Sequence, residues 1–276
     1  MSFKPIVREI RVRNALNRSG LPEYDYSLNP YLGCQHGCTY CYAPEFTKGE
    51  PGKRWGYVVY VKVNLLEVLS REVRRFRPGI VGVSTITDPY QPVESRYRLT
   101  RGSIDILCNA GFHVSIQTKS ALVIRDLDLL LKCEGQVDVG FTITTLGDDY
   151  RVIEPMAAHP MARAAALRRL ASHGIRTWIF LGPIIPMLND DPGHYKPIIK
   201  LAHETHSEVV IDRLRVKGSI AGRLGAHGIS VSVDNGWWVR KVHEIKGYCR
   251  ELGVNCITSD EEWRSKGANK GLLSFL

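Results

Sequence analysis

The chain has 276 residues, of which 44% are hydrophobic and 24% charged, and its formal net charge at pH 7 is +9. This length allows one large α/β domain or two small ones. No apolar run of about 18 residues occurs, which argues against a membrane-spanning helix. The first residues lack an apolar signal core, so we expect a cytoplasmic protein without a membrane partner and with reduced thiols. The odd number of cysteines, seven, also argues against a full disulfide framework.

In chain order, residues 1–28 are predicted to form an extended arm that wraps the core. Residues 29–216 are predicted to form the main domain, because strand-like and helix-like runs alternate there. Residues 217–276 are predicted to form a basic loop and a helical C-terminal extension packed on the same domain.

Within the main domain, short runs rich in Val, Ile, Thr and Phe show little polar alternation, which is typical of buried parallel strands. These predicted strands are a short one before Cys34 and the runs 79–86, 113–119, 137–145, 176–184 and 208–216. Helical stripes lie between them and after them, at Leu66–Phe76, Ala164–Leu170 and Trp238–Leu252. Such alternation implies right-handed βαβ units. Six strands are too few for a closed eight-stranded barrel, so the predicted fold is α/β, a partial (β/α)6 TIM-like barrel of parallel strands, with an open sheet as the alternative.

The stretch "NPYLGCQHGCTYCYAP", Asn29–Pro44, holds three cysteines: Cys34, Cys38 and Cys41. A zinc site normally needs a fourth ligand, often in a second paired motif, and no such motif follows. Three thiolates suit a four-iron cluster in which one iron stays open, since such clusters are otherwise held by four thiolates. The alternative is a structural zinc knuckle or free thiols.

This Cys-x3-Cys-x-aromatic-Cys pattern, with Tyr40 in the aromatic position, resembles the radical S-adenosylmethionine (radical SAM) superfamily. The resemblance implies an enzyme whose [4Fe–4S] cluster is held by the three cysteines and whose open iron binds S-adenosylmethionine. Reductive cleavage would then yield a 5′-deoxyadenosyl radical, with a reductant such as ferredoxin or flavodoxin as a partner. The protein would orient the cofactor and exclude water.

Within that superfamily the chain resembles the spore photoproduct lyase-like group, also called DNA repair photolyase-like proteins. The motifs that carry this resemblance are "STITDPYQPVE", "QTKSALVIRDLDLL", "FTITTLGDD" and "GPIIPMLND". It implies lyase-like radical chemistry, with Tyr40 and Tyr42 as catalytic residues in a radical relay. It also implies a nucleic-acid partner, DNA or RNA, which the positive charge permits without requiring it.

Further cofactor-binding residues are expected at the carboxyl ends of the strands, where sites of such folds lie. The resemblance assigns the methionine carboxylate to Lys119, and Tyr40 also lies beside the cofactor. Other polar and apolar contacts with the cofactor are expected from Ser84, Thr85, Thr142, Thr144 and Ile184. The alternatives are an exposed strand-end lysine, threonines that serve β-propensity, and a plain turn at Ile184.

The lyases of this group use a further cysteine as hydrogen donor, and the matching position here is Ser84 or Thr85. Cys108 and Cys249 are expected to be buried free cysteines, and Cys256 is the remaining substitute donor. Three functions therefore stay open: a radical enzyme acting on nucleic acid, in DNA repair or RNA modification; a radical enzyme acting on a small molecule or peptide; and a non-catalytic iron–sulfur binding or sensing module. If the substrate is a nucleic acid, Arg213, Arg215, Lys217 and Arg223 are expected to meet its phosphates.

Overall fold

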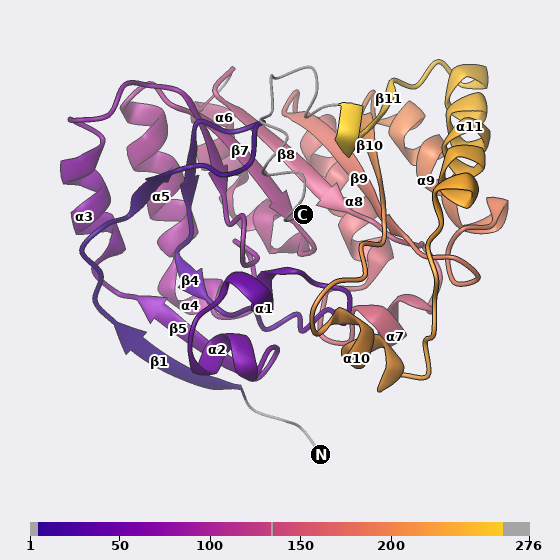
Figure 1. Ribbon diagram of the computed structural model, residues 1–276. Helices are drawn as coiled ribbons and strands as arrows, with labels where there is room; N and C mark the ends of the chain where they lie inside the picture. The colour runs from indigo at the N-terminus through magenta and orange to yellow at the C-terminus, as the bar shows by residue number, and fades with distance from the viewer. Residues whose placement is uncertain (1–4, 134, 262–276) are drawn as a thin grey trace.

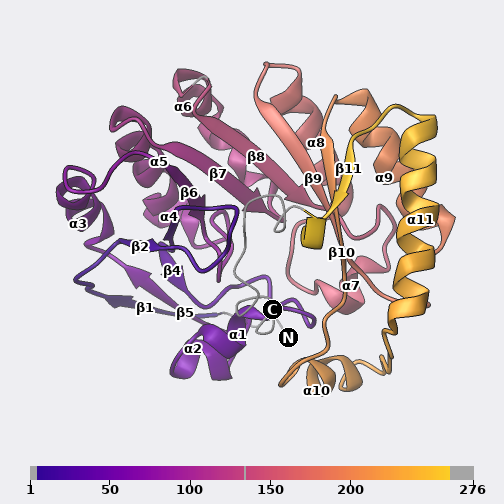
Figure 2. The same cartoon turned by 45° about the horizontal axis from the view of Figure 1, so that its top comes forward.

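The main body of the molecule is a curved, open sheet of eight strands. The computed structural model describes residues 5–133 and 135–261 (Figure 1). The strand order is β11-β10-β9-β8-β7-β6-β3-β2, and every neighbouring pair from β3 to β11 is parallel, whereas β2 pairs antiparallel with β3. The strands are β2 (Leu16–Arg18), β3 (Tyr26–Leu28), β6 (Ile80–Val83), β7 (His113–Thr118), β8 (Val137–Thr142), β9 (Arg176–Ile184), β10 (Glu208–Arg213) and β11 (Cys256–Thr258). The edges β2 and β11 are not paired with each other, so the predicted partial barrel is confirmed (Figure 2).

Helices connect successive parallel strands and cover the outer face of the sheet (Figure 2). The principal ones are α3 (Leu65–Glu72), α5 (Leu99–Asn109), α6 (Leu127–Lys132), α8 (Pro160–Ala171), α9 (Pro192–Glu204) and α11 (Asn235–Glu251). Outward-facing apolar side chains such as Ile116, Phe141 and Ile179 are fully buried between sheet and helices. The outer face is therefore the hydrophobic core, and the inner face of the barrel is left for other purposes.

Shorter elements surround the open end of the barrel. A second sheet has the order β1-β5-β4. Its strands are β1 (Ile6–Ile10), β5 (Val58–Lys62) and β4 (Tyr31–Leu32). The short helices are α1 (Ala43–Phe46), α2 (Glu50–Lys53), α4 (Glu94–Tyr97), η1 (Ala121–Asp126), α7 (Tyr150–Ile153) and α10 (Ile220–Gly225). No helix in the described part of the chain is both long and apolar enough to cross a membrane.

The structure differs from the predicted organisation at both ends. The N-terminal arm contributes β1, β2 and β3, and β3 belongs to the main sheet because it pairs in parallel with β6. The predicted basic loop contains helix α10, and the C-terminal extension adds the strand β11 to the barrel. Three-residue strands such as β3 and β11 are too short to show a clear pattern in the sequence.

Two disulfide bonds correct the prediction that Cys108, Cys249 and Cys256 are free. Cys108 at the end of α5 pairs with Cys133 at the end of α6, and Cys249 in α11 pairs with Cys256 in β11. A helical stripe shows that a cysteine is buried but not which other element packs against it. Cys256 is therefore not a free thiol, and the three cysteines of the Asn29–Pro44 segment are the free ones.

A fully buried ion pair joins the barrel to the segment that carries these cysteines. Arg163 of α8 lies 2.5 Å from Glu154, and neither side chain is exposed. Arg163 also donates to the backbone oxygens of Thr142 and Ala158, at 3.0 and 2.8 Å. Glu154 in turn accepts a hydrogen bond from the hydroxyl of Tyr40. Helix α8, strand β8 and the cysteine segment are thus connected through two buried charges.

Replacing one member of this pair should be costly, because it leaves the other charge buried without its partner. We expect Arg163→Met to lower the free energy of unfolding by about 3–5 kcal/mol, measured by urea denaturation. The matched control is Arg168→Met on the same helix. Arg168 pairs with Glu204 at 2.7 Å, with both side chains about half exposed (48% and 52%), so its loss should cost no more than about 1 kcal/mol. If the two substitutions lowered the free energy of unfolding equally, the buried Glu154–Arg163 pair would contribute no more than the exposed pair.

Candidate functional site

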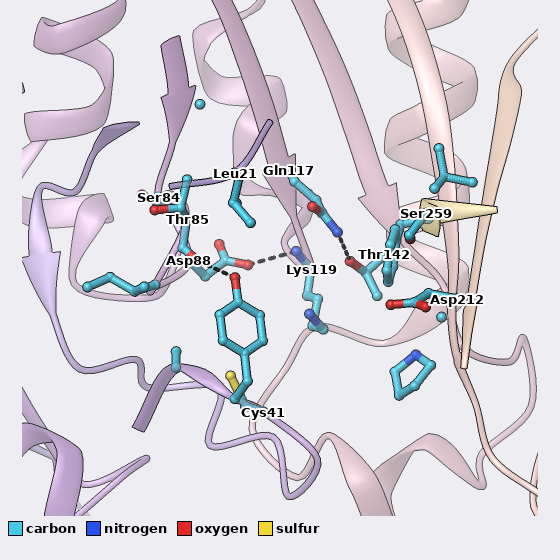
Figure 3. A pocket seen from close by; sticks show the side chains of 18 of the residues that line it. Leu21, Cys41, Ser84, Thr85, Asp88, Gln117, Lys119, Thr142, Asp212 and Ser259 are labelled. Carbon is cyan, nitrogen blue, oxygen red and sulfur yellow. Dashed lines mark hydrogen bonds between the residues drawn. The ribbon is translucent and has the colours of Figure 1, made fainter. Parts of the chain in front are cut away.

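The inner face of the partial barrel encloses a cavity of about 670 Å³. Side chains alternate across a strand, so every second residue points inward. The lining residues follow this rule: His113, Ser115 and Gln117 on β7, Asp138 and Thr142 on β8, and Arg176, Trp178 and Phe180 on β9. Figure 3 shows Ser84 and Asp88 on one side, Asp212 on the other, and Gln117, Lys119 and Thr142 between them. The volume is within the range of small-molecule and cofactor sites.

The cysteine loop, residues 33–41, closes one end of this cavity. Cys34, Cys38 and Cys41 all line it, and the first two are each only 5% exposed. Gly33 adopts a positive φ of 83°, and a Cβ there would lie 2.3 Å from the backbone oxygen of Val58. Only glycine fits this conformation and this close approach, so the loop can fold tightly and turn its three thiols toward one space.

Side chains distant in sequence hold this loop in place. The amide of Gln91 accepts a hydrogen bond from the backbone of Gln35 (2.9 Å) and donates to the oxygen of Gly33 (3.2 Å). Arg223 of α10 donates to the backbone oxygens of Thr39 (3.0 Å) and Cys41. The role of Gln91 could not be predicted, because nothing in the local sequence pattern indicates the cysteine loop as its partner.

Arg223 therefore does not have the role expected from the basic character of its segment. The guanidinium is directed at the cysteine loop, and its Nη1 also donates to Ser219. Arg213 donates to Asn235 at 2.6 Å, and Arg215 pairs with Asp212 and Asp260 at 3.0 and 3.2 Å. These three arginines bind groups of this chain, while Arg213, Arg215 and Lys217 also line the cavity, and their contact with phosphates stays a prediction.

Asp88 connects the cysteine loop to the end of β7. Its carboxylate accepts hydrogen bonds from the Thr118 hydroxyl (2.7 Å) and from the backbone amides of Tyr90 (2.9 Å) and Lys119 (2.8 Å), and it lies 3.3 Å from Nδ1 of His36. Burial alone would raise the pKa of Asp88, but His36 and the donors at Lys119 outweigh it and lower the pKa to about 2. Asp88 is therefore a fixed negative charge beside the loop.

The charge state of the site is set by burial and by Lys119. Burial raises the pKa of all three thiols, to about 12 for Cys38, where Lys119 acts in the opposite direction. Burial would lower the pKa of Lys119, but the carboxylates of Glu154 and Asp88, and Cys38 and Cys41 in their thiolate form, raise it overall. Lys119 is therefore a cation that faces the thiols, and metal binding would have to displace the thiol protons.

Six of the eight expected residues apart from the cysteines come together at this cavity, and two do not. Tyr40, Tyr42, Ser84, Thr85, Lys119 and Thr142 line it. Thr144 and Ile184 are fully buried elsewhere, and the backbone oxygen of Thr144 accepts a hydrogen bond from Asn189 at 2.9 Å. On β9 the inward positions Phe180 and Gly182 would also turn Ile184 inward by strict alternation. The register between β9 and β10 shifts between Leu181 and Ile184, however, and Pro183 lines the cavity in place of Ile184.

The two tyrosines of the motif are held differently. The hydroxyl of Tyr40 is bound to Glu154, and Nζ of Lys119 lies 5.7 Å from the centre of its ring. Burial and the Glu154 charge raise the pKa of Tyr40 well above its usual value. The hydroxyl of Tyr42 donates to the backbone oxygen of Thr85 at 2.5 Å, and Tyr42 is 39% exposed.

The donor set around the loop fits a bound group larger than one ion. Among the described residues, no group of three or more His, Cys, Asp or Glu is arranged to hold a single metal ion. Within the same residues, the buried Nε1 of Trp55 and Oγ of Ser84 have no hydrogen-bond partner, although both residues line the cavity. Ser84 also has a φ of 70°, and strained backbone of this kind is concentrated at functional sites. Three free thiols, a facing cation and unpaired polar atoms suit an iron–sulfur cluster with a cofactor beside it.

Asp212 gives the opposite side of the cavity an unusual carboxyl group. Burial and the neighbouring Asp260 raise its pKa to about 6, although Arg215 acts against them. The folded chain then binds more protons than the unfolded chain between pH 4 and 6, roughly from the ordinary aspartate pKa upward. The free energy of unfolding should therefore fall as the pH rises through this window.

We expect Asp212→Asn to remove this fall, which amounts to about 3 kcal/mol at roughly 1.4 kcal/mol per pKa unit, measured by urea denaturation between pH 4 and 7. Asp128→Asn is the control, because a hydrogen bond from Arg101 lowers the pKa of Asp128 to about 2. Asp128 contributes stability that is lost as the pH decreases, so its substitution acts in the opposite direction. An unchanged slope in Asp212→Asn would show that this carboxyl has an ordinary pKa.

Comparison with known proteins gives one family and one fold. The sequence profile described as the Radical SAM superfamily matches residues 28–196. An uncharacterized protein of Mycobacterium tuberculosis is 34% identical over 227 residues, 78% of this chain and 66% of that protein, so the chain spans slightly less than two thirds of this relative. The radical SAM Nalpha-GlyT isomerase of Pseudomonas phage M6 is 25% identical over 169 residues, 60% of this chain and 35% of that protein.

A spore photoproduct lyase variant solved with bound AdoMet and dinucleoside spore photoproduct shares the fold. Its TM-score is 0.71 at 15% identity, and the match covers 92% of this chain and 81% of that one. Because the profile covers more than half of the chain, the protein belongs to the radical SAM superfamily and is an enzyme of that family.

Proposed function

We propose that Cys34, Cys38 and Cys41 hold a [4Fe–4S] cluster, that S-adenosylmethionine binds beside it, and that the enzyme acts on a nucleic-acid substrate. The observation that carries the cofactor part is the geometry of the cavity: the three free cysteines line the same space as Lys119 and Thr142. When bound, these groups supply an electron and a 5′-deoxyadenosyl radical, which takes a hydrogen atom from the substrate. We propose a ferredoxin or flavodoxin as the reductant.

The residues of this chain bind, orient and screen the reacting groups. The Lys119 ammonium is directed at the cavity between Asp88 and Glu154 and is the natural partner for the methionine carboxylate. The hydroxyl of Thr142, held by Gln117 at 3.0 Å, and the unpaired hydroxyl of Ser84 offer further hydrogen bonds. Arg223 and Gln91 position the cysteine loop from behind and keep the geometry of the thiols.

A hydrogen-donor thiol is lacking where the resemblance to the lyases would place it. In the described part of the chain, the only cysteines that line the cavity are the three of the loop, and Cys256 is in a disulfide. We therefore propose a radical relay through Tyr42, whose hydroxyl is bound to the backbone of Thr85 at that same position. Tyr40 is tied to Glu154 and would serve to position the loop.

Two observations support a nucleic-acid substrate. The net charge of +9 favours polyanions. One similar protein is named a radical SAM Nalpha-GlyT isomerase, and another was solved with a dinucleoside spore photoproduct, which is a nucleic-acid fragment. Without a donor thiol, we propose base modification or rearrangement and not reversal of the spore lesion.

The cluster assignment is tested by iron content. Protein reconstituted without oxygen should bind about four irons per chain, and Cys34→Ser, Cys38→Ser or Cys41→Ser should abolish this, as measured by iron analysis and electron paramagnetic resonance. Cys256→Ser is the matched control and should keep its iron. Lys119→Ala should also keep its iron but weaken binding of S-adenosylmethionine by about 1.5–3 kcal/mol, the range for hydrogen bonds to charged groups. Stoichiometric zinc without iron would contradict the assignment.

The substrate class is tested by offering the reduced enzyme separate fractions of DNA, RNA, peptides and small metabolites. Formation of 5′-deoxyadenosine should rise only with a nucleic-acid fraction, and the affinity for that fraction should fall steeply with salt, because phosphate contacts release counterions. Synthetic spore photoproduct should not be repaired efficiently. Stimulation by the peptide or metabolite fraction alone would favour the small-molecule alternative, and efficient lesion repair would show that the missing thiol is not needed.

A further inference from the structure

The inner face of the barrel carries an aromatic surface, formed by Trp178 and Phe180, beneath the proposed cofactor residues. In the strand register, Thr142 pairs with Phe180, and Gly140 pairs with Trp178. Trp178 therefore lies one inward-facing row deeper than Thr142. Trp178 and Phe180 both line the cavity, and neither is fully buried. The two aromatic side chains therefore lie next to each other on the inner face of β9, both in contact with the cavity.

Glycines on the sheet make room for these rings. A Cβ at Gly140 would lie 2.2 Å from the indole ring of Trp178, and a Cβ at Gly182 would lie 2.6 Å from the ring of Phe180. Neither glycine has a positive φ, so backbone conformation does not account for their presence. The absence of a side chain instead allows each ring to lie flat against the strand, as expected where backbone and a ring approach closely.

The indole of Trp178 is also locked in position. Its Nε1 donates to Asp138 at 2.7 Å, and the same carboxylate accepts from the hydroxyl of Ser115 at 2.8 Å and lies 2.6 Å from Nε2 of His113. These contacts of Asp138 lie away from the cysteine loop, and they fix the orientation of the Trp178 indole ring. A preorganised ring loses little conformational entropy when a ligand stacks on it.

Polar atoms stand at the edge of this surface. The amide nitrogen of Gln117 donates a hydrogen bond to the Thr142 hydroxyl (Figure 3), and its amide oxygen has no hydrogen-bond partner within the described residues. The hydroxyl of Ser84, a residue only 8% exposed, also lines the cavity and has no hydrogen-bond partner there. A flat apolar face with unpaired polar atoms at its rim is complementary to a planar heterocycle that carries N–H and C=O groups at its edge.

We propose that Trp178 and Phe180 form the platform on which a single nucleobase of the substrate stacks, with Gln117 and Ser84 recognising its edge. This inference rests on the proposed nucleic-acid function and specifies how the substrate binds. A cavity of about 670 Å³ takes one small ligand beside the cofactor and excludes a duplex. The base must therefore come from a free nucleoside or from a strand in which it is unpaired or turned out of the stack.

The test measures binding of labelled nucleosides, of a single-stranded oligonucleotide and of a duplex with one unpaired base. It uses the reconstituted full chain saturated with S-adenosylmethionine and without reductant, so that the adenine of the cofactor cannot be mistaken for the substrate. Trp178→Ala should weaken binding about five- to 150-fold, the equivalent of the stacking contribution measured per base. Trp178→Phe, which keeps a ring but loses the bond to Asp138, should lose less.

Two matched controls separate stacking from general damage. Trp237→Ala removes a tryptophan of α11 whose Nε1 donates to Asp190, and it should leave binding unchanged. Gly140→Ala should displace the indole and weaken binding, whereas Gly222→Ala, whose Cβ would meet nothing within 4 Å, should not. Urea denaturation confirms that each variant is folded.

The outcomes distinguish this inference from the proposed function. Preference for free nucleosides or for the oligonucleotides identifies the source of the base and supports the platform in either case. Normal binding of nucleic acid by both Trp178→Ala and Gly140→Ala would overturn the platform and leave the proposed function standing. Binding of no nucleoside and no oligonucleotide by the unaltered chain would overturn both.

Discussion

The buried ion pair between Glu154 and Arg163 is the interaction on which the geometry of the site depends. The cysteine loop has little regular secondary structure of its own, so its position relative to the barrel must come from side chains. Arg163 binds the end of β8 through the oxygen of Thr142, and Glu154 binds the loop through Tyr40. Two opposite charges without solvent are costly to separate, and this makes the connection between barrel and loop stiff.

A second set of buried polar contacts does the same from the other side of the loop. Asp88 binds the end of β7, lies beside His36 of the loop, and places its negative charge near Lys119. Lys119 is thus held between carboxylates and thiols at the point where a cofactor carboxylate is expected. The buried side-chain atoms that have no hydrogen-bond partner among the described residues include Oγ of Ser84 and Nε1 of Trp55, and both of these residues line the cavity.

The barrel divides its two faces between stability and function. The outward residues of β7, β8 and β9 form the hydrophobic core under the helices, whereas the inward residues are polar, aromatic or glycine. An open, incomplete barrel leaves this inner face accessible, where a closed eight-stranded barrel would fill it with packed side chains. The cysteine loop at one end and the Trp178 surface deeper inside are thereby brought into one space.

The sequence alone determined the features that depend on neighbouring residues. The three cysteines lie within eight positions, so their convergence could be read directly, and Lys119 and Thr142 were placed because parallel strands end at one edge of a sheet. Only the tertiary structure decided which residues distant in the chain meet. No local sequence pattern indicates these contacts. They are the pairs Glu154–Arg163, Asp88–His36 and Cys249–Cys256, the hydrogen bond from Arg223 to the cysteine loop, and the packing of Trp178 on Gly140. The burial of Ile184 belongs with these, because the facing of a residue at the irregular end of a strand is set by what packs around it and not by periodicity.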